Sequence, residues 1–452
     1  MSQVLAVDYT PFDYAKSLNG GDTAWVLASA ALVLLMTPGL AFFYGGMVRA
    51  KNVLAMLMQN FAAIAIVSVT WIVIGFTWAF GGDGKYLGDL HFFGMQHIND
   101  VVPTLGTAQT TPTVAFVAFQ VTFAIITPAL ITGATADRWK FGAFVAFVTI
   151  WSIVIYAPVA HWVFDAYGWL NRVGIDGKYY AEDFAGGTVV HINAGAAGLA
   201  MALLLGRRKG WPREQMRGHN IPFVMLGAGL LWFGWFGFNA GSALAANNLA
   251  SYAWVNTNTA TATAMLGWLI AEKLRYGKST ALGAASGAVA GLVAITPCAG
   301  FVSPIWSLFI GLLAGFVCAF AVSLKTRLGF DDSLDVVGVH FVGGWIGTLC
   351  VGLFSTTGTN SFAVNGLFYG GGGSLLLHQF LAALAVSVFS FVGTLVIGFV
   401  VNLVFKNRVT ADEEQEGLDT SVHGESAYDF GGIGGGLGLH QTTLATKESV
   451  QA

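Results

Sequence analysis

Long apolar runs separated by short polar segments make up most of the chain. A helix needs about 20 apolar residues to cross a bilayer, and most of the runs reach that length. The runs are continuous rather than alternating, which favours helices over a β-barrel. The pattern predicts an all-α polytopic membrane protein with eleven transmembrane helices, at about residues 24–48, 53–80, 112–136, 141–165, 184–206, 220–245, 252–271, 280–297, 304–324, 336–356 and 376–405.

The composition supports a membrane protein. Of the 452 residues, 55% are hydrophobic and 10% are charged, against roughly 25% charged residues in an ordinary soluble domain. Disordered chains have the opposite balance. A net charge of −3 without a basic face argues against nucleic-acid binding. The three cysteines lie in apolar runs without metal-ligand spacing, so neither a bound metal nor a disulfide is predicted.

Basic residues are unevenly distributed between alternate loops. With eleven spans, seventeen of the 21 Lys and Arg residues fall on one side, and Lys16, Lys85, Arg172 and Lys178 fall on the other. The positive-inside rule then places the N-terminus outside and the C-terminus in the cytoplasm. We expect an extracellular segment over 1–23, without the features of a cleaved signal peptide, a helical domain over 24–405 and a cytoplasmic tail over 406–452.

Two of the predicted spans carry the same pattern around a histidine. His191 is followed by Gly195 and Gly198, and His340 is followed by Gly344 and Gly347, so both stretches have the form H-x-x-x-G-x-x-G. They fall in the fifth and tenth spans. A repeat of five spans reverses topology, which predicts two inverted five-helix repeats plus a final helix, with a site near the membrane midplane.

His191 and His340 are the histidines that lie well inside predicted spans. Intramembrane ionisable residues mark functional sites. A pair of imidazoles can also act as a structural contact between helices, or as the two axial ligands of a haem. We favour a functional pair because the two residues are related by the repeat. No cofactor is expected, since glycines beside both histidines suit close helix packing.

Aromatic and polar residues near one end of the spans suggest a cation site. Phe119 and Phe123 share a helix face, as do Phe238 and Ser242. A hydroxyl beside aromatic faces can hold a small cation by hydrogen bonding and cation–π attraction. Asp183 opens the fifth span, where an acid caps free N–H groups and also adds a negative field.

Taken together, these stretches resemble the ammonium transporter (Amt/Mep/Rh) family, on its Amt branch. The resemblance covers all eleven spans and the tail. It is carried by Gly-Leu-Ala-Phe-Phe43-Tyr44, Phe119-Gln-Val-Thr-Phe123, Asp183-Phe-Ala-Gly-Gly-Thr-Val-Val-His191, Trp235-Phe-Gly-Phe238-Asn-Ala-Gly-Ser242, Thr296-Pro, Asp335-Val336-Val-Gly-Val-His340 and Gly417-Leu-Asp-Thr-Ser-Val-His423-Gly-Glu425-Ser-Ala-Tyr428.

The resemblance implies a homotrimer in the plasma (cell inner) membrane, with one conduction path in each subunit. It assigns the paired pore histidines to His191 and His340 and the stacked gate to Phe123 and Phe238. The other implied positions are the recruitment residues Phe119, Phe123, Phe164, Ser242 and Asp183, and the pore-lining residues Trp235, Thr296, Phe43, Tyr44 and Val336.

One position departs from the family pattern. After His161-Trp162-Val, the family usually has Trp followed by Gly, and this chain has Phe164-Asp165. Phe offers a weaker cation–π face than Trp. Trp169 or the charge of Asp165 are two candidate substitutes for the missing indole.

Physics favours one route for ammonium. An unpaired NH4+ in an apolar pore would lose its hydration at high cost, whereas neutral NH3 loses much less. We therefore expect that NH4+ is recruited outside and deprotonated, and that NH3 passes the twin histidines while the proton follows through the imidazoles. Such transport is electrogenic, and methylammonium would serve as an analogue. The alternatives are an electroneutral NH3 gas channel and an ammonium sensor or transceptor that signals through its tail.

No constellation typical of an enzyme is present: the sequence has no nucleophile arrangement, phosphate loop or metal cluster. The acidic, Gly-rich tail could be a solvated end, but acids facing basic inner loops also allow docking. The resemblance assigns a regulatory role to Gly417, His423, Glu425 and Tyr428 and implies a PII-type signalling protein as a partner.

Overall fold

The structure, a computed structural model, describes residues 9–171 and 181–428. Parts of the predicted N-terminal segment and tail, together with Arg172 and Lys178, lie outside these described residues. Within them the chain forms helices and loops, with three isolated β-bridges and no strand. The all-helical prediction is therefore confirmed for the described residues.

A helix lies over each of the first five predicted runs. These are α1 (Gly20–Met47), then α2 (Val53–Thr70) continued by η2 (Trp71–Gly75) and α3 (Phe76–Phe80), then α4 (Thr113–Thr135), then α5 (Phe141–Trp151) continued by η5 (Ser152–Tyr156) and α6 (Ala157–Phe164), and η6 (Gly187–Ile192) continued by α7 (Asn193–Leu205).

The later runs also coincide with helices. These are α8 (Ile221–Ala240), α9 (Asn248–Tyr276), α10 (Ala281–Ile295), α11 (Pro304–Ala321), η8 (Val337–Phe341) continued by α13 (Val342–Phe354), and α14 (Ser374–Phe405). Shorter helices occupy the connections and the tail: η1 (Ala50–Asn52), η3 (Phe93–Met95), η4 (Gly106–Ala108), η7 (Gly241–Ala243), α12 (Leu324–Leu328), η9 (Leu367–Tyr369), α15 (Ala411–Glu416) and α16 (Leu418–His423).

Nine helical segments in the described part of the chain are long and apolar enough to cross a membrane, by length and composition. The two remaining predicted runs differ for visible reasons. The helix α10 has 15 residues, and α9 carries several Asn and Thr residues and has Lys273 and Arg275 in its last turn.

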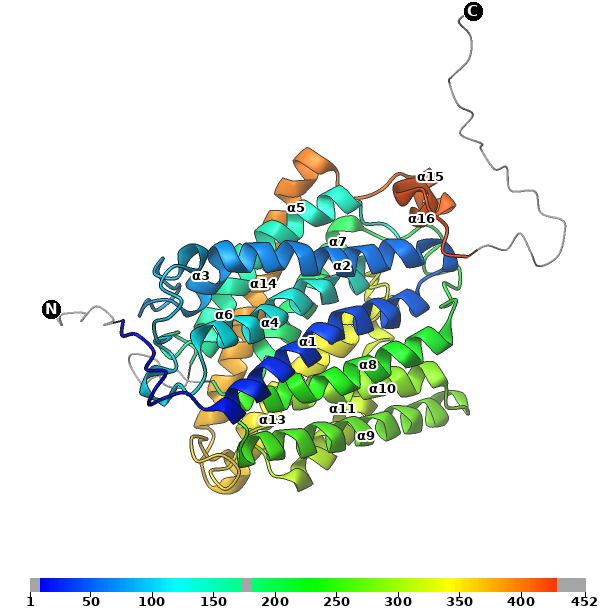
Figure 1. The fold of residues 1–452 in the computed structure, drawn as a ribbon. Helices are drawn as coiled ribbons and strands as arrows, with labels where there is room; N and C mark the ends of the chain where they lie inside the picture. The colour runs from blue at the N-terminus through cyan, green and yellow to red at the C-terminus, as the bar shows by residue number, and fades with distance from the viewer. Residues whose placement is uncertain (1–8, 172–180, 429–452) are drawn as a thin grey trace, which may run out of the picture.

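The long helices run side by side in one bundle (Figure 1). The helix α1 packs along α8, and α9 packs along α10 and α11. The start of α1 lies at one end of the bundle, and α15 and α16 lie at the opposite end (Figure 1). We call these the N-terminal end and the tail end. Many helix surfaces away from the core expose Leu, Val and Phe, as expected where lipid is the solvent.

Candidate conduction pore

A histidine pair lies at the centre of the bundle. The Nδ1 atoms of His191 and His340 are 3.3 Å apart, and the two rings are nearly parallel, with centroids 5.4 Å apart. Both side chains are buried, at 1% and 2% exposure. One Nδ1 must carry the hydrogen and donate it to the other, so the pair shares a single N–H between two rings. The predicted meeting of the two histidines is present in the structure.

The two histidine helices begin with the same local structure. The carboxylate of Asp183 accepts the backbone N–H groups of Gly186, Gly187, Thr188 and Val189. That of Asp332 accepts those of Val336 and Val337. Three residues after each acid the backbone is left-handed, with φ 113° at Gly186 and φ 67° at Asp335. A π-helical turn carrying the histidine follows in each case.

The counterpart of Asp183 in the other histidine helix is Asp332. Asp332 makes the capping bonds and lies eight residues before its histidine, as Asp183 does. Asp335 instead lies 2.6 Å from the ammonium group of Lys325. The acid–histidine spacing is thus the same in both helices.

Reciprocal glycine contacts bring the histidine helices together. A Cβ on Gly195 would lie 2.6 Å from the backbone nitrogen of Phe341, directly after His340. A Cβ on Gly344 would lie 3.2 Å from the backbone nitrogen of Ile192, directly after His191. Each glycine therefore admits the backbone that follows the opposite histidine. The glycines four residues after each histidine explain how the imidazoles reach contact distance.

A narrow cavity of about 10 Å³ adjoins the pair. Its wall is otherwise apolar or aromatic, with Trp235 stacked on His191 at 5.3 Å between ring centroids. The indole N–H of Trp235 donates to Thr296 Oγ1 at 2.9 Å. Thr296 thus orients Trp235 rather than lining this cavity. His191 Nε2 is buried and has no hydrogen-bond partner among the described residues.

Two stacked phenylalanine rings close the cavity toward the N-terminal end. The centroids of Phe123 and Phe238 are 4.2 Å apart, with an angle of 27° between the rings. Phe238 lines the histidine cavity, and Phe123 lines a second pocket on the other side. The pair therefore separates the two spaces. Phe119 packs edge-on against Phe123 at 4.9 Å.

The second pocket, of about 300 Å³, contains all the predicted recruitment residues. We call it the vestibule. Phe119, Phe123, Phe164, Asp183 and Ser242 all contribute to its wall. The Ser242 hydroxyl donates to the carbonyl of Phe238 at 2.8 Å, and its oxygen can still accept a hydrogen bond. These residues come from three helices and a loop, so their convergence is a property of the fold.

The polar vestibule residues that were not predicted are Thr104, Gln120, Asn171 and Glu182. Gln120 lines the pocket, and its side-chain oxygen is buried without a hydrogen-bond partner in the described chain. Glu182 also lines it, and its carboxylate accepts from Ser355 and from the backbone of Val364. The paired acids Glu182 and Asp183 before an apolar run were the available signal. Asp183 has a capping geometry here, since backbone N–H groups occupy its oxygens.

Neither proposed substitute for the family Trp is part of the vestibule wall. Asp165 is fully buried, and burial raises the pKa of its carboxyl to about 8, although the hydrogen bond from the backbone N–H of Tyr167 lowers this pKa. At neutral pH Asp165 is therefore mainly protonated and supplies little attraction. Trp169 contacts Trp162 at 5.5 Å and lines a different pocket. Phe164 does line the vestibule, 6.5 Å from Phe123 between ring centroids.

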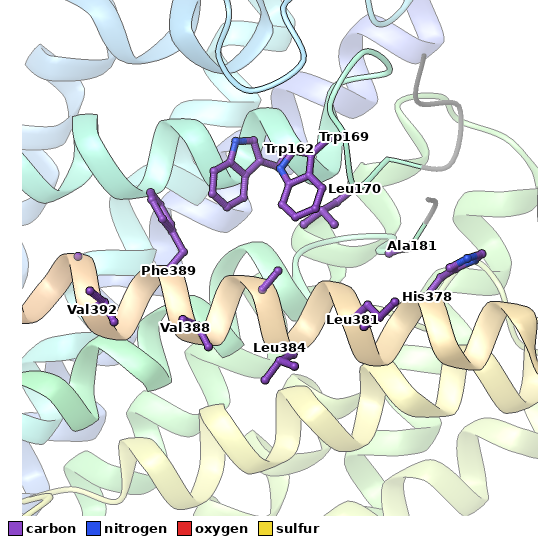
Figure 2. Close-up of a pocket in the computed structure, with 12 residues that line it drawn as sticks. Trp162, Trp169, Leu170, Ala181, His378, Leu381, Leu384, Val388, Phe389 and Val392 are labelled. Carbon is purple, nitrogen blue, oxygen red and sulfur yellow. The ribbon is translucent and has the colours of Figure 1, made fainter. Parts of the chain in front are cut away.

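The pocket beside Trp169 is an apolar groove along α14. Figure 2 shows Trp162 and Trp169 facing the helix that carries Leu384, Val388 and Phe389. Its volume is about 940 Å³, but it has little polar surface and no contact with the histidine pair. A groove of this kind does not suit a small cation.

The remaining pore candidates lie on the tail side of the histidines. The Tyr44 hydroxyl donates to the carbonyl of Leu130, a residue of the histidine cavity, at 3.3 Å. Tyr44 and Val336 meet across Gly133, where a Cβ would lie within 2.8 Å of both. The Phe43 ring lies 5.8 Å from that of Tyr44. All three side chains are buried, so the path on this side is closed in this conformation.

The described part of the tail docks on the bundle. Glu414 is buried and accepts from the backbone of Lys209 at 2.6 Å and from Arg408 at 2.8 Å. Asp419 accepts the backbone N–H groups of Leu54 and Ala55 at the start of α2. Glu414 thus binds the basic loop at Lys209, and Asp419 binds the N-terminus of α2. Residues 409–423 are therefore packed on the bundle and do not extend into solvent.

The four predicted regulatory residues are placed differently. Gly417 has φ 113°, and a Cβ there would lie 2.6 Å from Lys51 Cβ. The Tyr428 hydroxyl lies 2.7 Å from His219 Nε2, and the His423 ring packs edge-on against Phe141 at 5.3 Å. Glu425 is exposed, and its backbone N–H donates to Asp419. Three of the four therefore touch the bundle.

Fold and site together define a multi-pass helical membrane protein with a buried histidine pair behind two stacked phenylalanine rings. The chain belongs to the ammonium transporter family, because the model of the Ammonium Transporter Family matches residues 24–428. This confirms the resemblance drawn from the sequence. Its relatives in Mycobacterium bovis and Bacillus subtilis are named as ammonium transporters, which are not enzymes.

Several known proteins are similar along most of their length. The chain is 52% identical to an ammonium transporter of Mycobacterium bovis, over 91% of each chain. It is 48% identical to one of Bacillus subtilis, over 90% of this chain and 98% of the relative. Its fold matches the crystal structure of Candida albicans Mep2 with a TM-score of 0.82, 32% identity and 89% coverage of both chains. A structure described as a sensor Amt protein matches with a TM-score of 0.80 and 31% identity, over 89% of this chain and 98% of that one.

Proposed function

We propose that this protein carries ammonium across the plasma membrane as NH3 and a separately relayed proton. The observation that carries the proposal is the contact of two buried imidazoles, 3.3 Å between Nδ1 atoms, behind the ring pair Phe123–Phe238. A closed apolar cavity beside them disfavours a bare cation strongly. A neutral molecule the size of NH3 is a suitable guest.

The first step is recruitment of NH4+ in the vestibule. The faces of Phe119, Phe123 and Phe164 attract a cation, and the Ser242 oxygen accepts one of its N–H groups. The Asp183 carboxylate holds the wall in place and adds a negative field. K+ meets the same attraction but has no proton to give, so it stops at the gate.

The second step separates the proton from the ammonia. His191 Nε2, which has no partner in the described chain, accepts one proton from the NH4+ that reaches the ring pair Phe123–Phe238, and the remaining NH3 passes between the two rings. Because the two Nδ1 atoms share one hydrogen, a proton taken up at one imidazole can leave from the other. The proton then travels with the NH3 in the same direction, and transport is electrogenic.

The same proposal includes the assembly and topology. Eleven transmembrane helices, with α9 and α10 among them, form two inverted five-helix repeats plus a final helix, and three such subunits form a homotrimer. The tail end faces the cytoplasm, where Arg and Lys are concentrated. A PII-type signalling protein is the proposed cytoplasmic partner, on family resemblance.

An ammonium jump on the purified protein in liposomes tests the proposal. The expected result is an inward current with ammonium, a smaller one with methylammonium and none with K+. Internal alkalinisation without current would replace the electrogenic mechanism by an electroneutral NH3 channel. Neither current nor pH change, in liposomes that retain the folded protein, would favour the sensor hypothesis, which the similarity to a sensor Amt protein makes the second candidate.

A further inference from the structure

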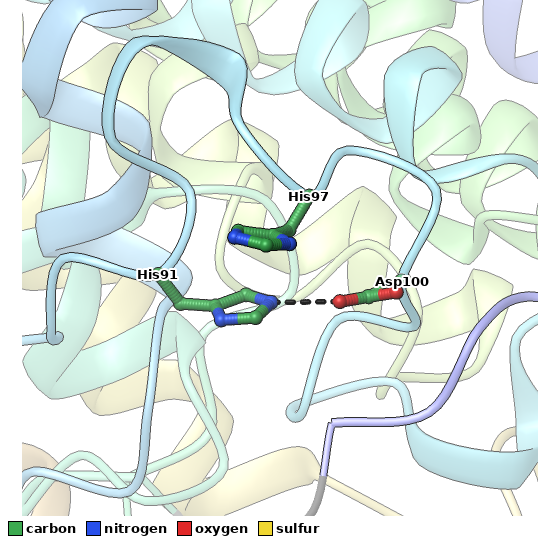
Figure 3. Close-up of side chains that lie close together, drawn as sticks. All are labelled: His91, His97 and Asp100. Carbon is green, nitrogen blue, oxygen red and sulfur yellow. Dashed lines mark hydrogen bonds and ion pairs between the residues drawn. The ribbon is translucent and has the colours of Figure 1, made fainter.

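A cluster of two histidines and an aspartate lies outside the pore, in the connection between α3 and α4. His91, His97 and Asp100 come from one loop at the N-terminal end of the bundle, and their side chains converge on one point (Figure 3). One ligand atom from each lies within 4.8 Å of the other two. The transport mechanism proposed above makes no use of them.

The three side chains are arranged for a shared ligand. His91 Nε2 lies 2.8 Å from a carboxylate oxygen of Asp100. The ring of His97 stacks over that of His91, with centroids 4.5 Å apart and 22° between the planes. The His97 ring has no hydrogen-bond partner among the described residues. The pairing of His91 with Asp100 therefore does not explain why a nitrogen of His97 lies close to the paired atoms of these two residues.

The loop backbone is folded sharply to bring His97 over His91. Met95 has φ 62° and His97 has φ 54°, the left-handed region that L-residues rarely adopt. Such conformations persist where the surrounding structure fixes them, and they concentrate at functional sites. Here the consequence of the unfavourable backbone is the stack of the two imidazoles.

Contacts with Tyr9, Asp89 and Thr113 hold the cluster in position. Tyr9 stacks on the other face of His91, with centroids 3.4 Å apart. Asp89 accepts from the Tyr9 hydroxyl and from the His91 backbone, both at 2.9 Å. The Asp100 carbonyl accepts from the Thr113 hydroxyl at 2.6 Å. The imidazole and carboxylate are thus positioned by bonds at both ends of the loop and by the N-terminal segment.

We propose that His91, His97 and Asp100 bind a divalent transition metal, for which Zn2+ is the probe. Imidazole nitrogen and carboxylate oxygen are ordinary Zn2+ ligands at about 2.0–2.2 Å, and three protein ligands leave one position for water. The cluster is partly exposed, so an ion can reach it from the solvent. The ion would replace the hydrogen bond between His91 Nε2 and Asp100, and a His97 nitrogen would move closer to both.

The site would tie together segments that border the vestibule. The same loop continues to Thr104, which lines the vestibule, accepts the Ala166 N–H at 2.7 Å and donates to the Phe164 carbonyl. Metal binding would hold this loop in place between the N-terminal segment, which contacts it through Tyr9, and the vestibule rim at Thr104. The inference rests on the loop geometry and stands independently of the transport mechanism.

Zinc titration of the purified full-length protein, free of any histidine tag, tests the site. His97→Asn removes one ligand and leaves the His91–Asp100 pair intact, and His91→Asn removes a second. His423→Asn, at the tail end, is the matched control. We expect one Zn2+ per chain in the wild type and the control, and binding weaker by about tenfold or more in both loop variants.

The thermal midpoint without metal shows whether each variant still folds. His97→Asn should have the same midpoint as the wild type without metal. It should also lack the shift in midpoint that Zn2+ causes in the wild type. Equal Zn2+ binding by His97→Asn and His423→Asn, or no stoichiometric binding by the wild type, would overturn the assignment. Either result leaves the proposed ammonium transport untouched, because that is measured by current in zinc-free buffer.

Discussion

The Nδ1 atoms of His191 and His340 lie 3.3 Å apart although 149 positions separate the residues in the chain. Their meeting depends on two glycines, Gly195 and Gly344, each of which admits the backbone next to the opposite histidine. Any side chain at these glycines would push the helices apart. The contact between the rings is therefore fixed by the packing of α7 against η8 and of α13 against η6.

Phe164→Trp should strengthen ammonium recruitment. Phe164 lines the vestibule, and an indole offers a better cation–π face, worth up to about 1 kcal/mol at a partly exposed site. The half-saturation concentration for the ammonium current should fall by up to about fivefold. Phe164→Leu should raise it, and Trp169→Leu, in the separate groove, should leave it unchanged. Identical half-saturation in the Trp and Leu variants at 164 would exclude a cation–π role.

Asp183→Asn should lower transport sharply while the protein still folds. An amide has one oxygen where the carboxylate uses both to accept four backbone N–H groups, and the negative field is lost. A destabilisation of about 1–3 kcal/mol is expected from the missing acceptor. Asp332→Asn is the matched variant in the other histidine helix. Thermal unfolding and current are measured on the same preparation. An Asp183→Asn protein as active as the wild type would show that Asp183 only caps its helix and that its charge is not needed for transport.

Asp165→Asn should remove a pH dependence of stability. Burial raises the pKa of Asp165 from 3.8 to about 8 in the folded protein, so folding favours the protonated form. Its stabilising contribution is complete below about pH 4 and is lost as the pH rises toward 8. Asn resembles the protonated acid and does not titrate. The difference in thermal midpoint between variant and wild type should grow in favour of Asn from pH 5 to pH 8, and a constant difference would show that Asp165 titrates normally.

Shortening the tail should impair activity without preventing trimer assembly. Deleting the residues after Arg408 removes the bonds of Glu414 and Asp419, which together outweigh the small value of single surface pairs. Gly417→Asp should also lower the current, because Gly417 has φ 113° and no room for a Cβ beside Lys51. Gly424→Asp is the control, since Gly424 also has positive φ but open space around it. An undiminished current in the truncated protein would make tail docking irrelevant to transport.

The helices and the paired histidines could be predicted from sequence because they follow from local chemistry. Apolar runs must satisfy their backbone groups within the run, so they become helices. The vestibule aromatics and Ser242 followed from family resemblance, and the structure places them in one pocket.

Other features depend on backbone conformations that the residue pattern does not reveal. Asp332 caps its helix because Asp335 is left-handed. Trp169 turns toward α14 and Asp165 toward the interior because the chain turns sharply after Phe164. The cluster His91–His97–Asp100 forms through two left-handed residues, so its spacing carried no metal signal. The docking of Asp419 on α2 joins segments 364 positions apart.

The ammonium-jump current of the histidine variants tests the proton relay most directly. Wild type, His191→Ala and His340→Ala are compared in liposomes at equal protein content, with K+ jumps as the selectivity control. We predict an ammonium current in the wild type and none in either variant, because a single imidazole cannot pass the proton on. An ammonium current as large as that of the wild type in both alanine variants, with K+ still excluded, would contradict the proton relay.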